Sequence, residues 1–424
     1  MGGVGVRVLD AVAPPRFGRS FRWLLASSWL TNLGDGIGLA AGPLLMASLT
    51  NDAFLISLAA LAVWAPPLLF GLYSGVLADR LDRRRLVVWV NIARAAVLVV
   101  LTVAVFSDVV TAPLVLMALF AVGTAEVFAD NTSATLLPML VRRDDLAVAN
   151  SRMLAGVITI NQLAGPAVGA ALFALGSATP FGTEALVVAL GALLASRMAL
   201  PPHGRAATDA SAARLRHEIA EGVRWVRHHP AVRTLVLTIF IFNITFGAAW
   251  SVLVLYATRR LGLGEIGFGL LTSISAAGGV LGSVVYARIV ARISLGDIMR
   301  IGLIIETLTH LALALTRTPW IAYAVFFVFG AHAFIWGTTS ITVRQRAVPT
   351  ALQGRVTSVN QVGVYGGLVI GSGIGGLLAQ RYNVTAPFWF AFAGSAVFVV
   401  VIWRQLRHIS LADDEPEPEP VSPR

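Results

Sequence analysis

Two long apolar stretches of the chain are separated by the charged run Gly75-Val-Leu-Ala-Asp-Arg-Leu-Asp-Arg-Arg-Arg85. Each flanking stretch is long enough to cross a bilayer, which takes about 20 mainly apolar residues. A membrane protein concentrates so much charge in a very short turn where the turn holds or moves something. The run therefore predicts a polytopic membrane protein with a functional loop at one membrane face.

The composition agrees with this interpretation. The chain is 57% hydrophobic and 13% charged, and its mean hydropathy is +0.78, whereas soluble domains are about 45–50% apolar and about 25% charged. The net charge of +10 is spread over short loops, where arginines set topology, so we exclude nucleic-acid binding. The chain has no cysteine, and neither a disulfide framework nor a thiolate metal site is available.

Apolar segments of membrane-spanning length recur along the whole chain and predict twelve transmembrane helices. They lie near 21–47, 53–78, 86–106, 113–137, 147–173, 180–200, 233–257, 266–290, 297–315, 319–341, 356–379 and 385–404. The first segment follows several arginines and has no small-residue cleavage pattern after it, so we expect it to be retained.

Arginines in the loops predict the orientation. Most of them fall on the side of both termini, in the 80–85 run, the 142–143 turn, the long central loop and the turns near 288–292 and 344–346. The opposite side has only Arg259, Arg260, Arg317 and Arg381. By the positive-inside rule both termini are cytoplasmic in a multi-pass protein of the bacterial plasma membrane.

The central loop has a composition of its own. Within it Leu215, Ile219, Val223 and Val226 recur at three- and four-residue spacing among arginines, which predicts a basic amphipathic helix at the membrane surface. A partner-binding role for this helix is the alternative to a plain interfacial linker. We predict a six-helix bundle over 1–201, a cytoplasmic linker over 202–232, a second six-helix bundle over 233–406 and a disordered acidic, proline-rich tail over 407–424.

The charged run resembles the loop that joins helices two and three in the major facilitator superfamily. Gly34-Asp35-Gly36, Leu77 to Arg84 and Ala149-Asn150-Ser151 resemble motifs of its bacterial branch of siderophore exporters and macrolide or tetracycline efflux proteins. The resemblance implies an all-α fold of twelve transmembrane helices in two pseudo-symmetric six-helix bundles, working by alternating access.

In the resembled family the aspartate of this loop docks against the cytoplasmic start of helix eleven and latches one conformation. The resemblance assigns that latch here to Gly75, Asp79, Arg80, Arg83, Arg84 and Arg355. The alternative is that the charges only set topology. The family's usual glycine three residues after the aspartate is Asp82 in this chain.

Gly165, Pro166 and Gly169 resemble a shortened form of the family's antiporter motif, which favours export. Small residues let a neighbouring helix approach closely, and the proline bends its helix. A glycine-proline pair is also common in any transmembrane helix, which is the alternative reading. Gly371, Gly373, Gly375 and Gly376 form a glycine-rich counterpart in the second half.

Ionisable residues within predicted spans are functional candidates, because a charge at the midplane costs about 2.5–3.5 kcal/mol. The candidates are Asp35, Glu126, Asp130, Glu306, His310 and His332. In the resembled family, helices one, four, seven and ten line the cavity, which selects Asp35, Glu126 and Asp130 for proton coupling and leaves the role of Glu306 and His310 open. Glu126 and Asp130 share one helix face, where mutual repulsion and burial disfavour ionisation of both. Structural pairing with Arg94 or polar neighbours is the alternative.

The rest of the expected cavity wall is apolar and aromatic. We assign Asn243, Phe246, Trp250, His332 and Trp336 to the substrate cavity. Such a wall suits a bulky amphiphilic or cationic compound better than a sugar. Aromatic side chains that face lipid are the alternative.

These observations predict a secondary transporter that exports amphiphilic small molecules, drugs or siderophore-like metabolites, in exchange for protons, as a monomer in the lipid bilayer. The alternatives are a proton-coupled importer or lysophospholipid translocator and, of another class, a membrane sensor or scaffold without transport. We expect no enzymatic activity, no cofactor and no metal. The chain has no P-loop, which argues against an ATP-driven pump.

Overall fold

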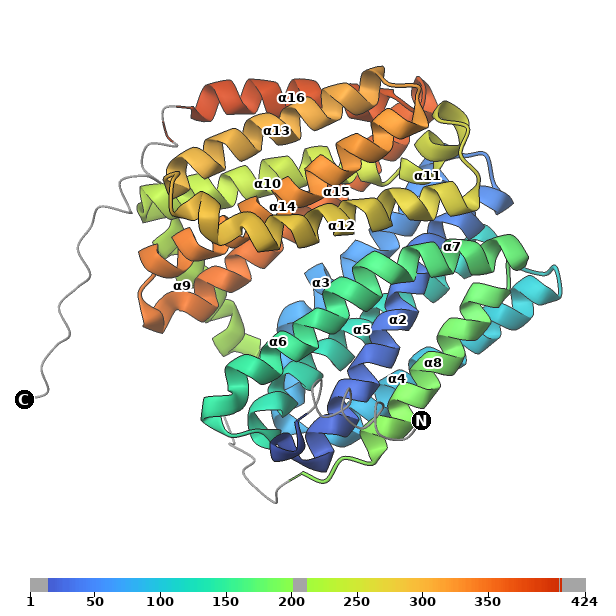
Figure 1. Cartoon of the computed structure of the whole chain (residues 1–424), viewed down its shortest axis with the longest axis vertical. Helices are drawn as coiled ribbons and strands as arrows, with labels where there is room; N and C mark the ends of the chain where they lie inside the picture. The colour runs from blue at the N-terminus through green and yellow to red at the C-terminus, as the bar shows by residue number, and fades with distance from the viewer. Residues whose placement is uncertain (1–13, 201–211, 404, 406–424) are drawn as a thin grey trace, which may run out of the picture.

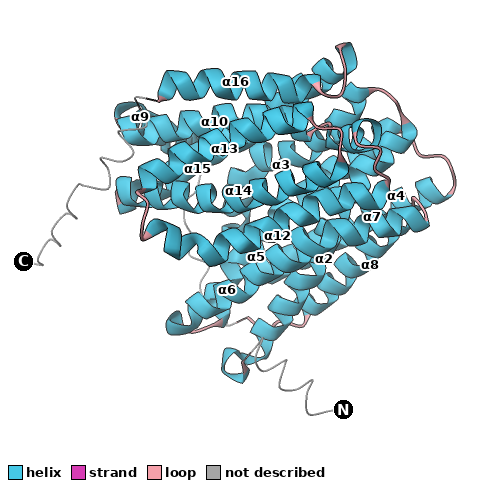
Figure 2. Ribbon diagram, turned by 45° about the horizontal axis from the view of Figure 1, so that its top comes forward, coloured by secondary structure: helices cyan, strands magenta, loops and turns pink. Residues whose placement is uncertain are grey.

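The computed structural model describes residues 14–200, 212–403 and 405. Regular structure in these residues is helical throughout, as Figure 2 shows. Ten candidate spans are long and apolar enough to cross a membrane. The 32-residue α2 (Gly18–Leu49) and the 17-residue α16 (Ala386–Ile402) occupy the first and last predicted spans, which makes twelve within the described part of the chain.

The other helices follow the predicted spans within a few residues. They are α3 (Ala53–Arg80), α4 (Arg83–Phe106), α5 (Ala112–Leu140), α6 (Leu146–Gly156) continued by the π-helix η3 (Val157–Ala164) and α7 (Gly165–Leu175), α8 (Thr179–Ser196), α9 (Ala212–His228), α10 (Pro230–Trp250), α11 (Leu253–Leu255) with the π-helix η4 (Tyr256–Arg260), α12 (Glu265–Val290), α13 (Leu295–Leu315), α14 (Pro319–Ala347) and α15 (Gln353–Arg381). The predicted all-α membrane fold is confirmed.

Two groups of helices lie side by side (Figure 1): α2 to α8, blue to green, and α10 to α16, yellow-green to red. In the first group α2 packs against α7 and α8, and α4 packs against α5 and α8. In the second, α10 packs against α15 and α16, and α14 packs against α12 and α13. The two groups meet where α3 contacts α15 and where α7 contacts α12. The predicted limits of the bundles and linker stay a prediction, and the proposed tail over 407–424 lies outside the described residues.

Contacts between the groups are found at the end of the molecule where α2 turns into α3. Nη2 of Arg259 donates to Oδ1 of Asn51 at 3.0 Å. The backbone nitrogen of Ala53 donates to Oε1 of Gln380 at 2.8 Å. We call this end the Asn51 end and the opposite one, where α3 turns into α4, the Arg83 end.

The turn at the Arg83 end is formed without glycine. Asp82 has φ −63°, and its carboxylate accepts the backbone N–H of Arg85 at 2.9 Å, so it caps α4. An aspartate therefore fits the position where the resembled family has glycine, and it supplies a helix cap that glycine lacks.

The amphipathic linker helix α9 packs on the second group of helices. Val226 is buried in a cluster with Val232, Val348 and Val356, whereas Val223 is 41% exposed. The predicted amphipathic helix is present, and one part of its apolar face covers α10 and α15. The side chain of Leu215 lies outside the described part.

Candidate functional site

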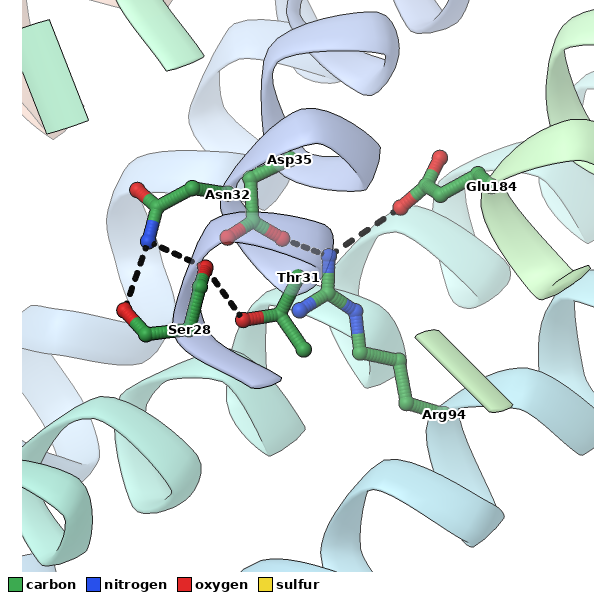
Figure 3. A network of polar contacts seen from close by, with 6 residues as sticks. All are labelled: Ser28, Thr31, Asn32, Asp35, Arg94 and Glu184. Atoms are coloured by element: carbon green, nitrogen blue, oxygen red, sulfur yellow. Dashed lines mark hydrogen bonds and ion pairs between the residues drawn. The ribbon is translucent and has the colours of Figure 1, made fainter. Parts of the chain in front are cut away.

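One buried arginine joins two carboxylates from different helices (Figure 3). Nη2 of Arg94 in α4 donates to Oδ1 of Asp35 in α2, and it lies 3.1 Å from Oε1 of Glu184 in α8. The three side chains are 1%, 5% and 3% exposed, respectively. Buried charges are tolerated when they are paired, so this triad is an internal ion-paired group.

Two glycines of α2 make room for the triad. A Cβ at Gly34 would lie 3.1 Å from Cγ of Glu184, and one at Gly38 would lie 3.1 Å from its Oε2. The backbone of α2 therefore runs directly against the glutamate side chain. Polar residues of the preceding turn lie beside Asp35: Asn32 donates to the carbonyl oxygen of Ser28 at 2.8 Å.

Two adjoining cavities lie between the two groups of helices. The first has a volume of about 570 Å³ and is lined by Asp35, Arg94, Glu126 and Glu184 together with mainly apolar residues. The second, of about 580 Å³, extends along α3, α5 and α15. Both cavities are lined by Leu39, Val63, Trp64, Gly123, Glu126, Asn161 and Gln162. The two cavities therefore adjoin at these residues, and the first contains the ion-paired triad.

Glu126 of α5 stands at the junction of the two cavities. It makes no ion pair or hydrogen bond to another residue in the described part of the chain. Asp130, one turn further along α5, lines the second cavity. In contrast to Asp35, which has Arg94 as its partner, these two carboxylates face open space.

The first cavity has an aromatic wall. Phe246 and Trp250 of α10 stack with ring centroids 4.3 Å apart, and Phe329 of α14 lies 4.8 Å from Trp250. Trp64 of α3 faces Phe246 from the other group of helices at 6.5 Å. All four line the first cavity. Phe246 and Trp250 therefore lie on a cavity wall, and their role in substrate binding stays a prediction.

Three other residues assigned to the substrate cavity do not line either of these cavities. Asn243 donates to the carbonyl oxygen of Ile239 on its own helix at 2.7 Å. His332 pairs with Glu306 of α13, and Trp336 packs against Gly302 of the same helix. The helical register turns these side chains toward α13 and α15, and their assignment to the substrate cavity stays a prediction.

The antiporter-like motif lies beside the ion-paired triad. A Cβ at Gly165 would lie 2.4 Å from Cα of Gly36, and one at Gly169 would lie 2.4 Å from the carbonyl oxygen of Ile37. The second group repeats this packing, since a Cβ at Gly371 of α15 would lie 2.3 Å from the carbonyl oxygen of Ile244 in α10. Glycine thus allows α2 and α7 to touch at the residue next to Asp35.

The π-helix η3 precedes this crossing. Gly165 donates its backbone N–H to the carbonyl of Ile160, five residues earlier, and Pro166 follows with no N–H to give. Asn161 and Gln162 in this wider turn line both cavities. Such π-bulges occur frequently at functional sites.

The residues assigned to the latch lie at the Arg83 end. Arg83 donates its Nε to the carbonyl of Ala78 at 3.2 Å, and Arg84 donates to the carbonyl of Met198 at 2.9 Å. Arg355 pairs with Glu221 of α9 at 2.7 Å. Arg80 is exposed, and a Cβ at Gly75 would meet no atom within 4 Å. The side chain of Asp79 lies outside the described part, so the latch stays a prediction.

The twelve-helix arrangement around a central charged cavity defines a membrane transporter of the major facilitator type. The chain belongs to the transmembrane secretion effector family, whose model matches residues 10–421. The resemblance found in the sequence is therefore confirmed.

Proteins similar to this chain include an efflux pump and an exporter. The multidrug efflux pump Tap of Mycolicibacterium fortuitum is 29% identical over 391 residues, which are 86% of this chain and 90% of the pump. The putative bacilysin exporter BacE of Bacillus amyloliquefaciens is 27% identical over 274 residues, 63% of this chain, so that the chain spans 66% of the exporter's length.

Solved structures support the fold. The nucleoside transporter NupG is 14% identical, with a TM-score of 0.72 over 92% of this chain and 99% of the transporter. A bacterial homologue of the iron transporter ferroportin in an inward-facing state is 19% identical, with a TM-score of 0.68 over 92% of this chain and 98% of the homologue.

Proposed function

We propose that this transporter exports amphiphilic, cationic small molecules in exchange for protons. The aromatic wall offers stacking and cation–π contacts to an apolar, positively charged body. Three acidic residues, Asp35, Glu126 and Glu184, face one arginine in the first cavity, so the space favours a cation. The export direction is supported by the two relatives that are named as an efflux pump and an exporter.

The observation that carries this proposal is the position of Glu126. It lines both cavities and has no partner in the described part of the chain, whereas Asp35 is already bound to Arg94. A carboxylate in this setting can hold a proton or face a cationic substrate, but not both at once. We therefore place the exchangeable proton on Glu126, with Asp130 one turn away as its exchange partner toward the second cavity.

The contacts between the two groups of helices support a proposal of alternating access. The hydrogen bonds that Arg259 donates to Asn51 and that Ala53 donates to Gln380 join the groups at the Asn51 end. We propose that these contacts break when the Arg83 end closes and Asp79 docks against the start of α15. Arg355, bound to Glu221 in this structure, would then exchange partners.

We further propose that the Arg83 end faces the cytoplasm of a bacterial cell, as the arginine distribution predicts. Ser107 and Arg292 are exposed at opposite ends of the molecule. Because the chain has no cysteine, an impermeant thiol reagent added to intact cells should label Ser107→Cys and spare Arg292→Cys. The reverse pattern would contradict the orientation.

Both cavity walls come from one chain, which favours a monomeric transporter.

The test is ethidium efflux from cells that express the protein. We expect efflux to collapse on addition of a protonophore and to be lost in Glu126→Gln at equal expression. Glu265→Gln is the matched control, because Glu265 is exposed at the start of α12 and lines neither cavity. Efflux that persists without a proton gradient, or in Glu126→Gln, would refute the proposal.

A further inference from the structure

Three ionisable side chains lie between α13 and α14, apart from the cavities described above. Glu306 and His310 occupy successive turns of α13, and His332 belongs to α14. None of them lines either cavity. The proposed function gives them no role, yet ionisable groups in membrane spans are costly to retain.

Glu306 lies next to His332 across the interface between α13 and α14. Its Oε2 lies 3.8 Å from Nε2 of His332, and the two side chains are 13% and 4% exposed. Gly302, one turn earlier on α13, leaves room for the imidazole, because a Cβ there would lie 2.9 Å from Cε1 of His332. The carboxylate is also one helical turn from His310.

His310 is buried without a hydrogen-bond partner. It is 0% exposed, and neither of its ring nitrogens is bonded in the described part of the chain. Nε1 of Trp336, also on α14, is buried and unbonded in the same region. Buried polar groups in folded proteins are nearly always paired, and exceptions need an explanation. A group that binds and releases a proton provides one.

Both histidines touch the back of the aromatic wall. The ring of His310 stands perpendicular to Trp250 at 6.0 Å, and the ring of His332 lies 6.0 Å from Phe329. Trp250 and Phe329 line the first cavity on their other side. A substrate on this wall is thus separated from each imidazole by a single aromatic ring.

Other ionisable residues of the helices packed here lie near helix ends. They are Arg233 of α10, Glu265, Tyr286 and Arg288 of α12, Asp297 and Arg300 of α13, and Tyr323, Arg344 and Arg346 of α14, while α16 has none. Tyr256 and Arg260 bond carbonyls at the far end of α13. Asp297 is paired with Arg300. Glu306 is therefore the acidic residue that pairs with His332 among the described residues between α13 and α14.

We propose that Glu306, His310 and His332 form a second proton-binding site, and that a cationic substrate on the aromatic wall expels its proton. The proton binds Nε2 of His332, with the Glu306 carboxylate, 3.8 Å away, as counter-ion. A positive charge on the far side of Trp250 or Phe329 repels the imidazolium across a medium of low dielectric constant. The proton then leaves as the substrate binds. This inference rests on the proposed export of cations and adds a coupling site in the second group of helices.

The experiment measures protons released when ethidium binds to the purified full-length protein in weakly buffered detergent solution, with a pH-indicator dye. We expect Glu306→Gln combined with His332→Asn to lower the release per bound ethidium by about half, since one of two sites is lost. His310→Phe keeps the packing against Trp250 and should lower the release in the same direction. Thr307→Val is the matched control, because Thr307 bonds only its own helix at Leu303.

The result that would overturn the inference is a release curve in these variants that equals the wild-type curve at equal ethidium occupancy. If Glu126→Gln lowers the release while these variants do not, the second site fails and the proposed function stands. If the wild-type protein releases no proton, both fail.

Discussion

Replacing Arg94 by methionine should destabilise the protein more than any other single change in the ion-paired triad. The substitution keeps an unbranched side chain but removes the guanidinium that bonds Asp35 and Glu184. Both carboxylates would stay behind with side chains that are only 5% and 3% exposed. Neither has another cationic partner in the described part of the chain.

The size of the effect follows from this burial. Removing one partner of a buried ion pair costs about 3–5 kcal/mol, because the remaining charge is left unpaired. Asp35→Asn should cost less, about 1–3 kcal/mol, since Arg94 retains Glu184 at 3.1 Å. The triple variant Arg94→Met, Asp35→Asn, Glu184→Gln should recover part of the loss, because no ionised group is then left unpaired.

The assay measures the apparent melting temperature of each variant in detergent, with size-exclusion chromatography as the readout. We expect the melting temperature to fall in the order wild type, Asp35→Asn, triple variant and Arg94→Met. An Arg94→Met protein that melts with the wild type, or a triple variant less stable than Arg94→Met, would refute the reasoning from unpaired charge.

Two further predictions concern the aromatic wall and the helix packing. Trp250→Ala should weaken ethidium binding by about tenfold, because a cation–π contact is worth about 1–2 kcal/mol. Trp320→Ala is the control, since Trp320 is 79% exposed and lines neither cavity, and equal dissociation constants for the two variants in a fluorescence titration would contradict the aromatic wall. Gly371→Ala should lower the melting temperature and reduce the free energy of unfolding by about 1–3 kcal/mol, because the new Cβ would lie 2.3 Å from a carbonyl oxygen of α10. Gly373→Ala is the control: its Cβ would meet no atom within 4 Å, and the variant should melt at the wild-type temperature.

Much of the fold could be predicted because membrane spans are specified by length and hydrophobicity alone. The predicted and observed limits of the span over α13 differ by two residues at the start, where Ser294 caps the helix by accepting the N–H of Asp297 at 3.1 Å. The π-helix before Pro166 was not predicted. The proline indicates a bend, but the bond from the N–H of Gly165 to the carbonyl of Ile160 lies at a close contact with α2, which the sequence alone does not specify.

The triad shows where the sequence analysis fell short. Glu184 was not among the predicted candidates. It is nevertheless an acidic residue in an otherwise apolar span, and the free-energy cost of a charge within the membrane, which selected Asp35, applies to it equally. In the resembled family helices one, four, seven and ten line the cavity, whereas Glu184 belongs to the sixth predicted span, so the resemblance does not assign it to the cavity. Pairing of Asp35 with Arg94, the alternative stated for the carboxylates, is what the structure contains.

The latch illustrates a different limit. Arg355 was assigned to Asp79, and the observed partner is Glu221 of the linker helix, at 2.7 Å. A periodic pattern predicts that α9 is amphipathic, but not which charged residue its polar face will meet. Exposed pairs of this kind are worth about 0–1 kcal/mol, so little free energy opposes an exchange of partners.

A liposome assay tests the proposed exchange most directly. The purified protein is reconstituted into liposomes that contain ethidium and the pH indicator pyranine. The liposomes are diluted into ethidium-free buffer while potassium and valinomycin clamp the membrane potential. Ethidium leaving the vesicles should draw protons inward and acidify the lumen, whichever way the transporter is inserted. Glu126→Gln should abolish the acidification, and Glu265→Gln should preserve it. An unchanged luminal pH during ethidium efflux, a luminal pH that rises, or full acidification by Glu126→Gln would contradict proton exchange at Glu126.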